Sequence, residues 1–285
     1  MITQNDVLNR YIFDNLHARG ELVQLKQSFS DIIDNHNYPP AVTQLLGELL
    51  SATCLLTATL KFEGEISVQI QGDGPVKYLV INGDNEQNMR GIASVTGPIT
   101  GTGLHDLMGQ ANMVITITPK NGERYQGVVA LEGETLSDCL EHYFQTSEQL
   151  DTKIWLFTDP EQHLSAGCLL QVLPDSEDKQ QQMQDFEHVS QLANTIKAEE
   201  IFSLDANDLL YRLYHDEEVR IFEPQTVKFV CGCSEDKCLA AIANIGRDGI
   251  EQHLAEQGAI SITCDFCKSE YVFDANKLKP LLNPN

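Results

Sequence analysis

Four cysteines near the C-terminal end form two closely spaced pairs, and this pattern constrains the chain more than any other feature. Cys231-Gly232-Cys233 is followed further along by Cys264-Asp265-Phe266-Cys267. In an extended segment residues two apart project to the same side, so Cys231 and Cys233 can aim both sulfurs at one point. Cys264 and Cys267 suit a tight turn. The spacing predicts one zinc ion per chain in a closed four-thiolate cage, with zinc–sulfur bonds of about 2.3 Å and no open position for a substrate.

Other interpretations of the cysteines stay open. Iron is the rival metal, and four unrelated buried cysteines are the structural alternative. Three features favour a redox sensor over a structural zinc site: the cluster follows a long polar tether, Cys238 lies nearby, and the sulfurs of the Cys-x-Cys pair are within reach of each other. Cys54, Cys139 and Cys168 lie in apolar contexts and are predicted to be core residues. We assign Cys238 no role.

Composition indicates a globular, cytoplasmic protein. The chain has 285 residues, of which 42% are hydrophobic, enough to build a core. The N-terminus lacks a basic region followed by an apolar run, so no secretory signal is expected. In a reducing cytosol the thiols should be free or metal-bound at rest.

The net charge of -23 argues against two classes of partner. Binding to nucleic acid or to an anionic membrane depends on clustered Lys and Arg, and the segment 231–285 has eight acidic and five basic residues. A DNA-binding zinc ribbon is therefore disfavoured. The longest apolar segment, 41–60, contains Gln44 and Glu48 and is predicted to be a buried helix, so no membrane partner is expected.

The hydrophobic periodicity of residues 1–174 predicts an α+β core domain, an antiparallel sheet with packed helices. The type of the segment 6–25 stays open. Helices are expected over 28–35, 42–60 and 134–147, the second as the core helix. A β-hairpin is expected from 64–71 and 76–81, with further strands at 90–95, 113–118, 125–131, 153–157 and 167–173.

A polar stretch at 174–182 marks a domain boundary. Residues 175–226 are predicted to form a polar, helical and metastable linker. The apolar stripes of its helical segment, 186–212, are thin, so these helices should depend on docking to another part of the protein. Residues 227–285 are predicted to form a small zinc-binding redox-switch domain with short helices at 237–245 and 249–255.

Motifs of several enzyme classes are absent from the sequence. It contains no Gly-Lys dipeptide, hence no Walker A loop, no Gly-x-Ser-x-Gly elbow and no His-Glu-x-x-His. His142 and His215 each lie beside an acidic residue, but solvated surface histidines are far more common than catalytic ones. We expect no enzyme activity and no catalytic residue.

The cysteine pairs, with the segments 210–219 and 125–133 and the helix 136–149, make the chain resemble the heat-shock protein 33 family of redox-regulated chaperones over nearly its whole length. The resemblance implies an ATP-independent holdase, active in oxidative stress, that protects unfolded or oxidatively damaged client proteins. In the family, zinc on the four cysteines keeps the chaperone inactive. The resemblance further implies that oxidation forms the disulfides Cys231–Cys233 and Cys264–Cys267, releases zinc and favours a homodimer.

Physical chemistry supports such a switch. A small zinc domain has little core, so its metal-binding free energy, on the order of 10 kcal/mol, is largely its folding free energy. Losing zinc should unfold it, and the segment 186–229 would then lose the zinc domain as its docking partner and expose its apolar stripes. Two alternatives remain: a structural zinc-ribbon interaction module, and a thiol-disulfide oxidoreductase using Cys264 and Cys267, which would need one exposed thiol of low pKa and no zinc.

Overall fold

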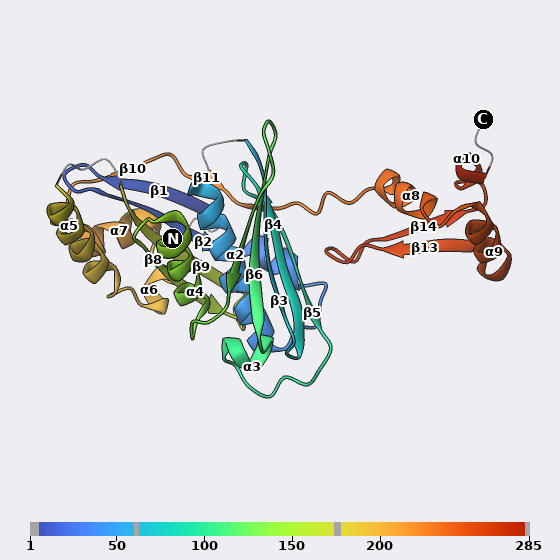
Figure 1. Cartoon of the computed structure of the whole chain (residues 1–285), viewed down its shortest axis with the longest axis horizontal. Helices are drawn as coiled ribbons and strands as arrows, with labels where there is room; N and C mark the ends of the chain where they lie inside the picture. Colours follow the sequence, from blue (N-terminus) through green and yellow to red (C-terminus); the bar gives the residue numbers. More distant parts are fainter. Residues whose placement is uncertain (1–5, 60–62, 174–177, 283–285) are drawn as a thin grey trace. The chain divides into compact units, whose positions relative to one another are not determined.

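The structure is a computed structural model that describes residues 6–59, 63–173 and 178–282. It divides into an N-terminal unit, Met1–Phe229, and a C-terminal unit, Val230–Asn285. Both units combine antiparallel strands with helices, which confirms the predicted α+β class (Figure 1). The start of the predicted boundary, residues 174–177, lies outside the described residues, as does the end of the predicted helix 42–60.

The core helix of the N-terminal unit is α2 (Pro40–Thr59), which contacts strands of two different sheets (Figure 1). It is long and apolar enough to cross a membrane by length and composition, but 78% of its most apolar 18-residue window is buried inside the protein. Apolar side chains on several sides of α2, including Leu46, Leu49 and Leu55, are fully buried against its neighbours. Burial on most sides is expected of a helix packed between two sheets, and the predicted core helix is confirmed.

The first sheet contains both strands of the segment whose type the sequence left open. Its order is β10-β1-β2-β9-β8, and β11 also pairs with β1. The strands are β1 (Val7–Phe13), β2 (Ala18–Leu25), β8 (Thr152–Asp159), β9 (Leu164–Val172), β10 (Val219–Ile221) and β11 (Gln225–Thr226). All the pairings are antiparallel.

The second sheet has the order β12-β5-β4-β3-β6-β7. It confirms the predicted hairpin and the three strands that follow it. Its members are β3 (Gly64–Gly72), β4 (Val76–Asp84), β5 (Asn88–Val95), β6 (Ala111–Pro119), β7 (Tyr125–Ala130) and β12 (Lys228–Phe229). Only β12 runs parallel to its neighbour, pairing with β5 over two residues.

Three shorter helices complete the core: α1 (Gln27–Ile33), α3 (Leu104–Met108) and α4 (Leu136–Tyr143). The N-cap of α4 is Thr135, whose hydroxyl accepts a hydrogen bond from the Asp138 backbone N–H. The predicted helix 134–147 is α-helical only to Tyr143 and continues as a π-helical turn, Phe144–Glu148.

The segment after residue 178 folds into three helices, which we call the linker helices: α5 (Lys179–Ala193), α6 (Ala198–Ser203) and α7 (Ala206–Tyr214). They pack against the face of the first sheet that does not face α2. The sheet and the helices together form one apolar cluster, which we call the linker cluster. Its buried members are Tyr11, Phe13, Ala18, Leu22, Ala166, Cys168, Leu170, Val172, Phe186, Val189, Ala193, Ile196, Ile201, Ala206, Leu209, Leu210, Leu213 and Tyr214.

Hydrogen bonds reinforce this docking at two points. The Gln24 side-chain amide donates to the backbone oxygens of Ile201 (2.6 Å) and Leu204 (2.9 Å). The Trp155 indole N–H, on the edge strand β8, donates to Asn194 Oδ1 at the end of α5 (3.0 Å). The sheet therefore supplies the docking surface that the thin apolar stripes of the linker require.

The docking also buries polar groups without partners. Within the described residues, Asn9 Nδ2 on β1 and Ser190 Oγ on α5 are buried and form no hydrogen bond. Asn9 lies on the same face of β1 as Tyr11 and Phe13. Each unsatisfied group costs about 1–3 kcal/mol. Their presence lowers the stability of the docked linker relative to an all-apolar interface.

The chain folds into two compact units with one boundary, between Phe229 and Val230, and the linker helices belong to the N-terminal unit. The sequence predicts a finer division, into a core domain at 1–174, a redox-sensitive, metastable linker at 175–226 and a zinc-binding domain at 227–285. It stays a prediction, because a single folded conformation does not reveal the order of unfolding.

A buried carboxyl on β2 makes the stability of the N-terminal unit depend on pH. Glu21 is 2% exposed, and its Oε2 has no hydrogen-bond partner among the described residues. Burial raises its pKa from 4.5 to about 7, although Arg19 and Arg10 act in the opposite direction. Since the folded-state pKa is the higher one, the contribution of Glu21 to stability is fully present below pH 4.5 and is lost as the pH rises from 4.5 to about 7.

We expect Glu21→Gln to raise the free energy of unfolding of the N-terminal unit by about 3 kcal/mol at pH 8, and by less than about 1 kcal/mol at pH 5. Urea unfolding followed by the fluorescence of Trp155, the single tryptophan of the chain, measures both values. The same gain at both pH values would contradict the prediction.

The C-terminal unit has little apolar core. It contains α8 (Glu235–Ala243), α9 (Arg247–Gln257), the hairpin β13 (Ala259–Thr263) and β14 (Glu270–Asp274), and α10 (Lys279–Leu282). The two predicted helices are α8 and α9. Its buried apolar residues are Cys238, Ile242, Ile250, Ile260, Phe273 and Leu278. A core of this size is marginal for independent folding without a metal or a cross-link.

Candidate metal and redox centre

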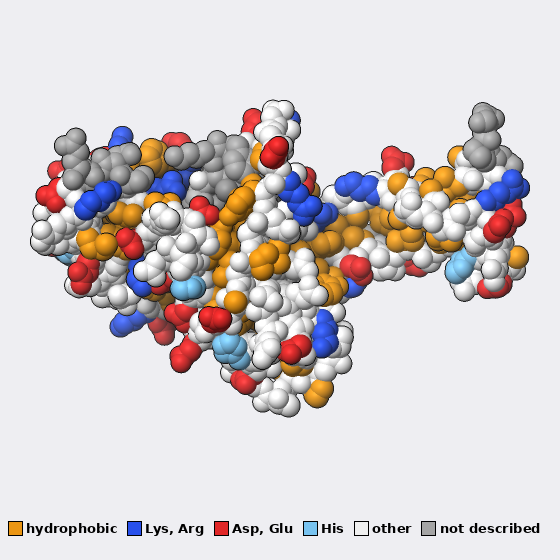
Figure 2. Space-filling view, viewed as in Figure 1, with side chains coloured by type: hydrophobic (Ala, Val, Ile, Leu, Met, Phe, Trp, Pro, Cys, Tyr) orange, Lys and Arg blue, Asp and Glu red, His pale blue; other side chains and the backbone are white. Residues whose placement is uncertain are grey.

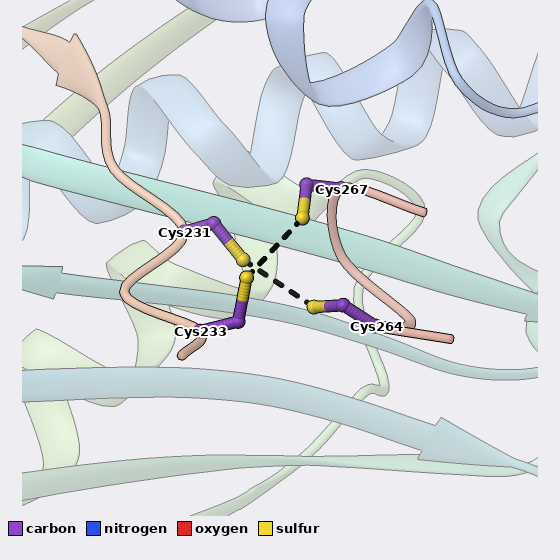
Figure 3. Close-up of side chains that lie close together, drawn as sticks. All are labelled: Cys231, Cys233, Cys264 and Cys267. Atoms are coloured by element: carbon purple, nitrogen blue, oxygen red, sulfur yellow. Dashed lines mark hydrogen bonds between the residues drawn. The ribbon is translucent and has the colours of Figure 1, made fainter. Parts of the chain in front are cut away.

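The four paired cysteines converge within the C-terminal unit. Cys231 and Cys233 lie on the extended segment between β12 and α8, and Cys264 and Cys267 lie in the turn that joins β13 to β14. Figure 3 shows the four sulfurs turned toward one point from these two segments. All four Sγ atoms lie within 4.8 Å of one another. The structure thus brings together every residue that the sequence predicted as a ligand.

The first pair owes its shape to the glycine between the cysteines. Gly232 has φ +67°, a left-handed conformation that residues with a Cβ adopt at a cost. Its carbonyl accepts a hydrogen bond from Lys237 Nζ (2.6 Å). Ser234 then begins α8 as its N-cap, accepting a hydrogen bond from the Lys237 N–H. The helix therefore holds the cysteine pair at its N-terminal end.

The second pair lies in a tight hairpin turn, as predicted. The Lys268 N–H donates to the Cys264 carbonyl (2.8 Å), and the Cys264 N–H donates to the Ser269 carbonyl (2.9 Å). The strand pairing Thr263–Glu270 continues the register directly outside the turn. The hairpin fixes the backbone that carries both sulfurs.

The sulfur geometry fits a metal held by four thiolates. Cys231 Sγ lies 3.4 Å from Cys264 Sγ, and Cys233 Sγ lies 3.5 Å from Cys267 Sγ. A tetrahedral zinc site with bonds of about 2.3 Å places its sulfurs about 3.8 Å apart. A disulfide needs about 2.05 Å. All four cysteines are free thiols in this structure, and their distances match a tetrahedral cage far better than a bonded pair.

Hydroxyl groups contact two of the sulfurs. The Tyr271 hydroxyl lies 3.1 Å from Cys233 Sγ, and Ser269 Oγ lies 3.2 Å from Cys267 Sγ. The hydrogen bond to Cys233 raises the pKa of Tyr271 to about 12. Burial raises the pKa of Cys267, but hydrogen bonds with the side chain and backbone of Ser269, and with Cys231 and Cys233, outweigh burial and bring the pKa to about 6. Burial raises the pKa of Cys231.

The other four cysteines lie outside the cluster. Cys54 and Cys168 are fully buried in the N-terminal unit, and burial raises the pKa of both, that of Cys168 to about 12. Cys139 is also buried there. Cys238 belongs to the core of the C-terminal unit. Inert, protonated thiols are expected in such surroundings. The predicted core positions of Cys54, Cys139 and Cys168 are confirmed.

Sequence reasoning missed the polar residues around the sulfurs: Lys237, Ser269 and Tyr271. Lys237 and Ser269 lie within a few residues of a cysteine, which is a weak signal by itself. Tyr271 follows the last cysteine on β14 and contacts a sulfur of the other pair, which sequence spacing does not reveal. The two histidines beside acidic residues, His142 and His215, are exposed.

Comparison with known proteins gives consistent matches. A family model described as Hsp33 protein matches residues 6–274. A protein named 33 kDa chaperonin from Colwellia psychrerythraea is 59% identical, with 99% of each chain covered. Another of that name, from Pseudoalteromonas translucida, is 55% identical, covering 98% of this chain and 100% of the relative.

A solved structure shares the fold. The crystal structure of a 33 kDa chaperonin, a heat shock protein 33 homolog from Thermotoga maritima, superimposes with a TM-score of 0.82. The match covers 98% of each chain at 19% sequence identity.

Proposed function

Because this chain belongs to the Hsp33 protein family, we propose that it is a redox-regulated, ATP-independent holdase. It binds unfolding or oxidatively damaged proteins and keeps them from aggregating. It is inactive when its cysteines are reduced and metal-bound, and oxidative stress activates it. Its relatives are named as chaperonins and not as enzymes.

Cys231, Cys233, Cys264 and Cys267 would hold one zinc ion per chain. When bound, zinc keeps the four sulfurs deprotonated and ties the segment before α8 to the β13–β14 hairpin. The four-sulfur group within 4.8 Å supports this assignment, and its all-cysteine composition suits zinc. The small core of the C-terminal unit makes its folding depend on this link.

Oxidation removes the ligands. The formation of each disulfide removes two electrons from two thiolates, and hydrogen peroxide accepts them to give water after protonation. The family resemblance points to the pairs Cys231–Cys233 and Cys264–Cys267. Cys231 Sγ also lies 3.4 Å from Cys264 Sγ, and Cys233 Sγ lies 3.5 Å from Cys267 Sγ, so pairing between the two segments is the alternative. Any of these disulfides requires the sulfurs to approach to about 2.05 Å, and peptide mapping of the oxidised chain tests which pairs form.

The linker cluster is the observation that carries the proposal. A holdase needs an apolar surface that is covered at rest and can be exposed, because exposed apolar patches bind unfolded chains. Undocking the linker helices would uncover two such surfaces, one on the sheet around Phe13 and Leu22 and one on the helices around Leu209 and Leu213. The unsatisfied polar groups in this interface keep the energy of undocking low.

The chain between the linker and the cysteines gives a physical connection. After α7, the strands β10, β11 and β12 attach successively to the edges of the two sheets. The last attachment, β12, consists of two residues, Lys228 and Phe229, directly before the first cysteine pair. If the C-terminal unit unfolds, the unfolded chain begins one residue after Phe229, and this two-residue pairing is the first part of the N-terminal unit that it could release.

The proposed holdase function also includes partners, an oligomeric state and a cellular compartment. The partners are unfolded or oxidatively damaged client proteins, and the active form is a homodimer. The protein acts in the cytoplasm and uses neither nucleic acid nor a membrane as a partner. The face drawn in Figure 2 carries Asp and Glu side chains interspersed with Lys and Arg, which fits an acidic protein that remains in solution.

The test is a client assay run on one preparation in two redox states. The reduced, zinc-loaded chain should give little protection to a heat-denatured client enzyme. Treatment with peroxide and mild heat, or with hypochlorous acid, should release one equivalent of zinc and suppress client aggregation without ATP. Light scattering reports aggregation, and a chromophoric chelator reports zinc release. Reductant and zinc should restore the inactive form.

The outcomes separate the alternatives. Equal protection in both states would leave the metal as a structural element of an interaction module. No protection in either state would contradict the chaperone function.

A thiol-disulfide oxidoreductase is the second candidate, because the pKa of Cys267 is lowered to about 6. A thiolate at neutral pH is the nucleophile in such enzymes. An oxidoreductase would reduce insulin disulfides over many turnovers with dithiothreitol, whereas a holdase binds clients stoichiometrically and catalyses no such turnover.

A further inference from the structure

Among the described residues, two hydroxyl groups contact sulfurs of the four-cysteine cluster, and each contacts a different cysteine pair. The Tyr271 hydroxyl lies 3.1 Å from Cys233 Sγ, a sulfur of the first pair. Ser269 Oγ lies 3.2 Å from Cys267 Sγ, a sulfur of the second pair. Each distance is within the range of hydrogen bonds that involve sulfur. Each pair therefore has one sulfur in contact with a hydroxyl.

In this structure the Cys267 thiol donates to Ser269 Oγ, and either atom can donate in the contact between Tyr271 and Cys233. The direction of both bonds depends on the protonation state of the sulfur. A thiolate has no proton, so the hydroxyl must then be the donor. A donated proton draws electron density from the sulfur lone pairs and makes them less available for attack on an electrophile. Hydrogen bonds to charged acceptors are also stronger than neutral ones, so the contact holds the sulfur in place.

The backbone of Tyr271 is fixed by strand pairing. This residue lies on β14 and pairs with Ile262 of β13, so its backbone is part of the hairpin that carries Cys264 and Cys267. Its hydroxyl reaches Cys233, which comes from the segment before α8. The bond thus links the two cysteine-bearing segments independently of the metal.

We propose that Tyr271 and Ser269 are positioning residues that slow the oxidation of the centre: Tyr271 donates to and restrains Cys233, and Ser269 does the same for Cys267. The proposal deepens the proposed function, since it takes the four cysteines as the thiolates of a redox-sensitive zinc site. It adds that the hydroxyl groups of Tyr271 and Ser269 control how fast the cysteines of that site are oxidised.

The reaction on which these hydroxyls act is the first oxidation step. A thiolate lone pair attacks one oxygen of hydrogen peroxide, the O–O bond breaks, and hydroxide leaves to be protonated to water. The sulfenic acid formed is then attacked by a second thiolate, which forms the S–S bond and releases a second hydroxide. If the pairs are Cys231–Cys233 and Cys264–Cys267, each disulfide consumes one sulfur that is held by a hydroxyl. The formation of each disulfide therefore requires the loss of one such bond.

The test maps which thiolate reacts first. The reduced, zinc-loaded full chain is treated with a small amount of N-ethylmaleimide, and the modified cysteine is identified by peptide mass spectrometry. Tyr271→Phe removes one oxygen and should raise the modification rate of Cys233 by about 3- to 10-fold. Ser269→Ala should do the same for Cys267 and leave Cys233 unchanged. Competition with a chromophoric chelator should show weaker zinc binding, by about 10-fold, in the Tyr271→Phe chain.

Ile260→Val is the matched control for simple loosening of the unit. Ile260 is buried in the same small core, on β13, and its side chain has no hydrogen-bonding group. It should change the rates at all four cysteines by a similar factor, without singling out one sulfur. Such a uniform change in the Tyr271→Phe and Ser269→Ala chains, or no change, would overturn the proposal.

Zinc content, measured before alkylation, separates this proposal from the function on which it rests. A wild-type chain without zinc would contradict the proposed function. If Tyr271→Phe alone lost its zinc while Ile260→Val kept it, the positioning role of Tyr271 would be supported directly, and Ser269→Ala would then test the effect on reactivity.

Discussion

Replacing Cys267 with serine is expected to abolish tight zinc binding and to leave residues 230–285 without stable structure. The binding free energy of a structural zinc site, about 10 kcal/mol or more, is largely folding free energy in a unit with so small a core. Serine is a poor zinc ligand and leaves three sulfurs of a four-sulfur cage. Metal analysis should show far less than one equivalent of zinc. Hydrogen exchange should show rapid exchange of the C-terminal unit, with protection kept in α2 and its neighbouring strands.

Cys238→Ala is the control for the loss of a cysteine from the same unit. Cys238 is buried in the core and lies outside the four-sulfur group, so this variant should keep one equivalent of zinc. A Cys267→Ser chain that still bound a full equivalent with unchanged affinity would show that the ligand set is wrong. Iron in the wild-type chain would show that the metal is wrong.

The second large effect is expected from a charge placed inside the linker cluster. Leu209 on α7 is fully buried there, and Leu209→Asp would bury a carboxylate without a partner. The cost, several kcal/mol, should exceed what holds the linker helices on the sheet, since that interface already contains unsatisfied polar groups. The variant should therefore protect a denatured client while still reduced and zinc-loaded.

Trp155 provides an optical measure of this undocking. Its indole N–H is hydrogen-bonded to Asn194 at the end of α5, so release of the linker should shift its fluorescence to longer wavelength. Tyr211→Asp adds the same charge to the same helix at a side chain that is 74% exposed, and it should resemble the wild type in both assays. If Leu209→Asp showed unchanged fluorescence and no activity, the linker cluster would not be the covered client surface.

These two variants test different parts of the switch. Cys267→Ser acts on the metal site and leaves the linker cluster intact in sequence, whereas Leu209→Asp acts on the linker and leaves the metal site intact. Protection by the second variant with zinc retained would place client binding downstream of metal release.

Local patterns in the sequence were sufficient for most individual elements. The apolar residues of the segment 42–60 occur at helical spacing on several sides, and the structure has α2 there. The alternation in 64–71 with the following Gly-rich turn predicted the β3–β4 hairpin. The two cysteine pairs were evident because ligands that share a metal occur at short, characteristic spacings. In each case the determining interactions lie within a few residues of one another.

Non-local pairing decided what the sequence left open. The segment 6–25 forms two strands because β9 and β10, far along the chain, pair with its edges. The thin stripes of the linker indicated that it needs a partner, and the sequence suggested the zinc domain. The fold instead packs the linker helices on the sheet around Leu22. The linker helices belong to the compact N-terminal unit because they pack on this sheet.

At the metal site, too, some features follow from local sequence and others from the packing of distant segments. The sequence by itself determined which four sulfurs belong together, since spacing within each pair restricts where their side chains can point. Only the tertiary structure decided what surrounds them: Tyr271 reaches Cys233 because the β13–β14 hairpin packs beside the segment that precedes α8. Contacts of this kind depend on the packing of distant segments, which periodicity and spacing do not encode, and they come into existence only when the chain has folded.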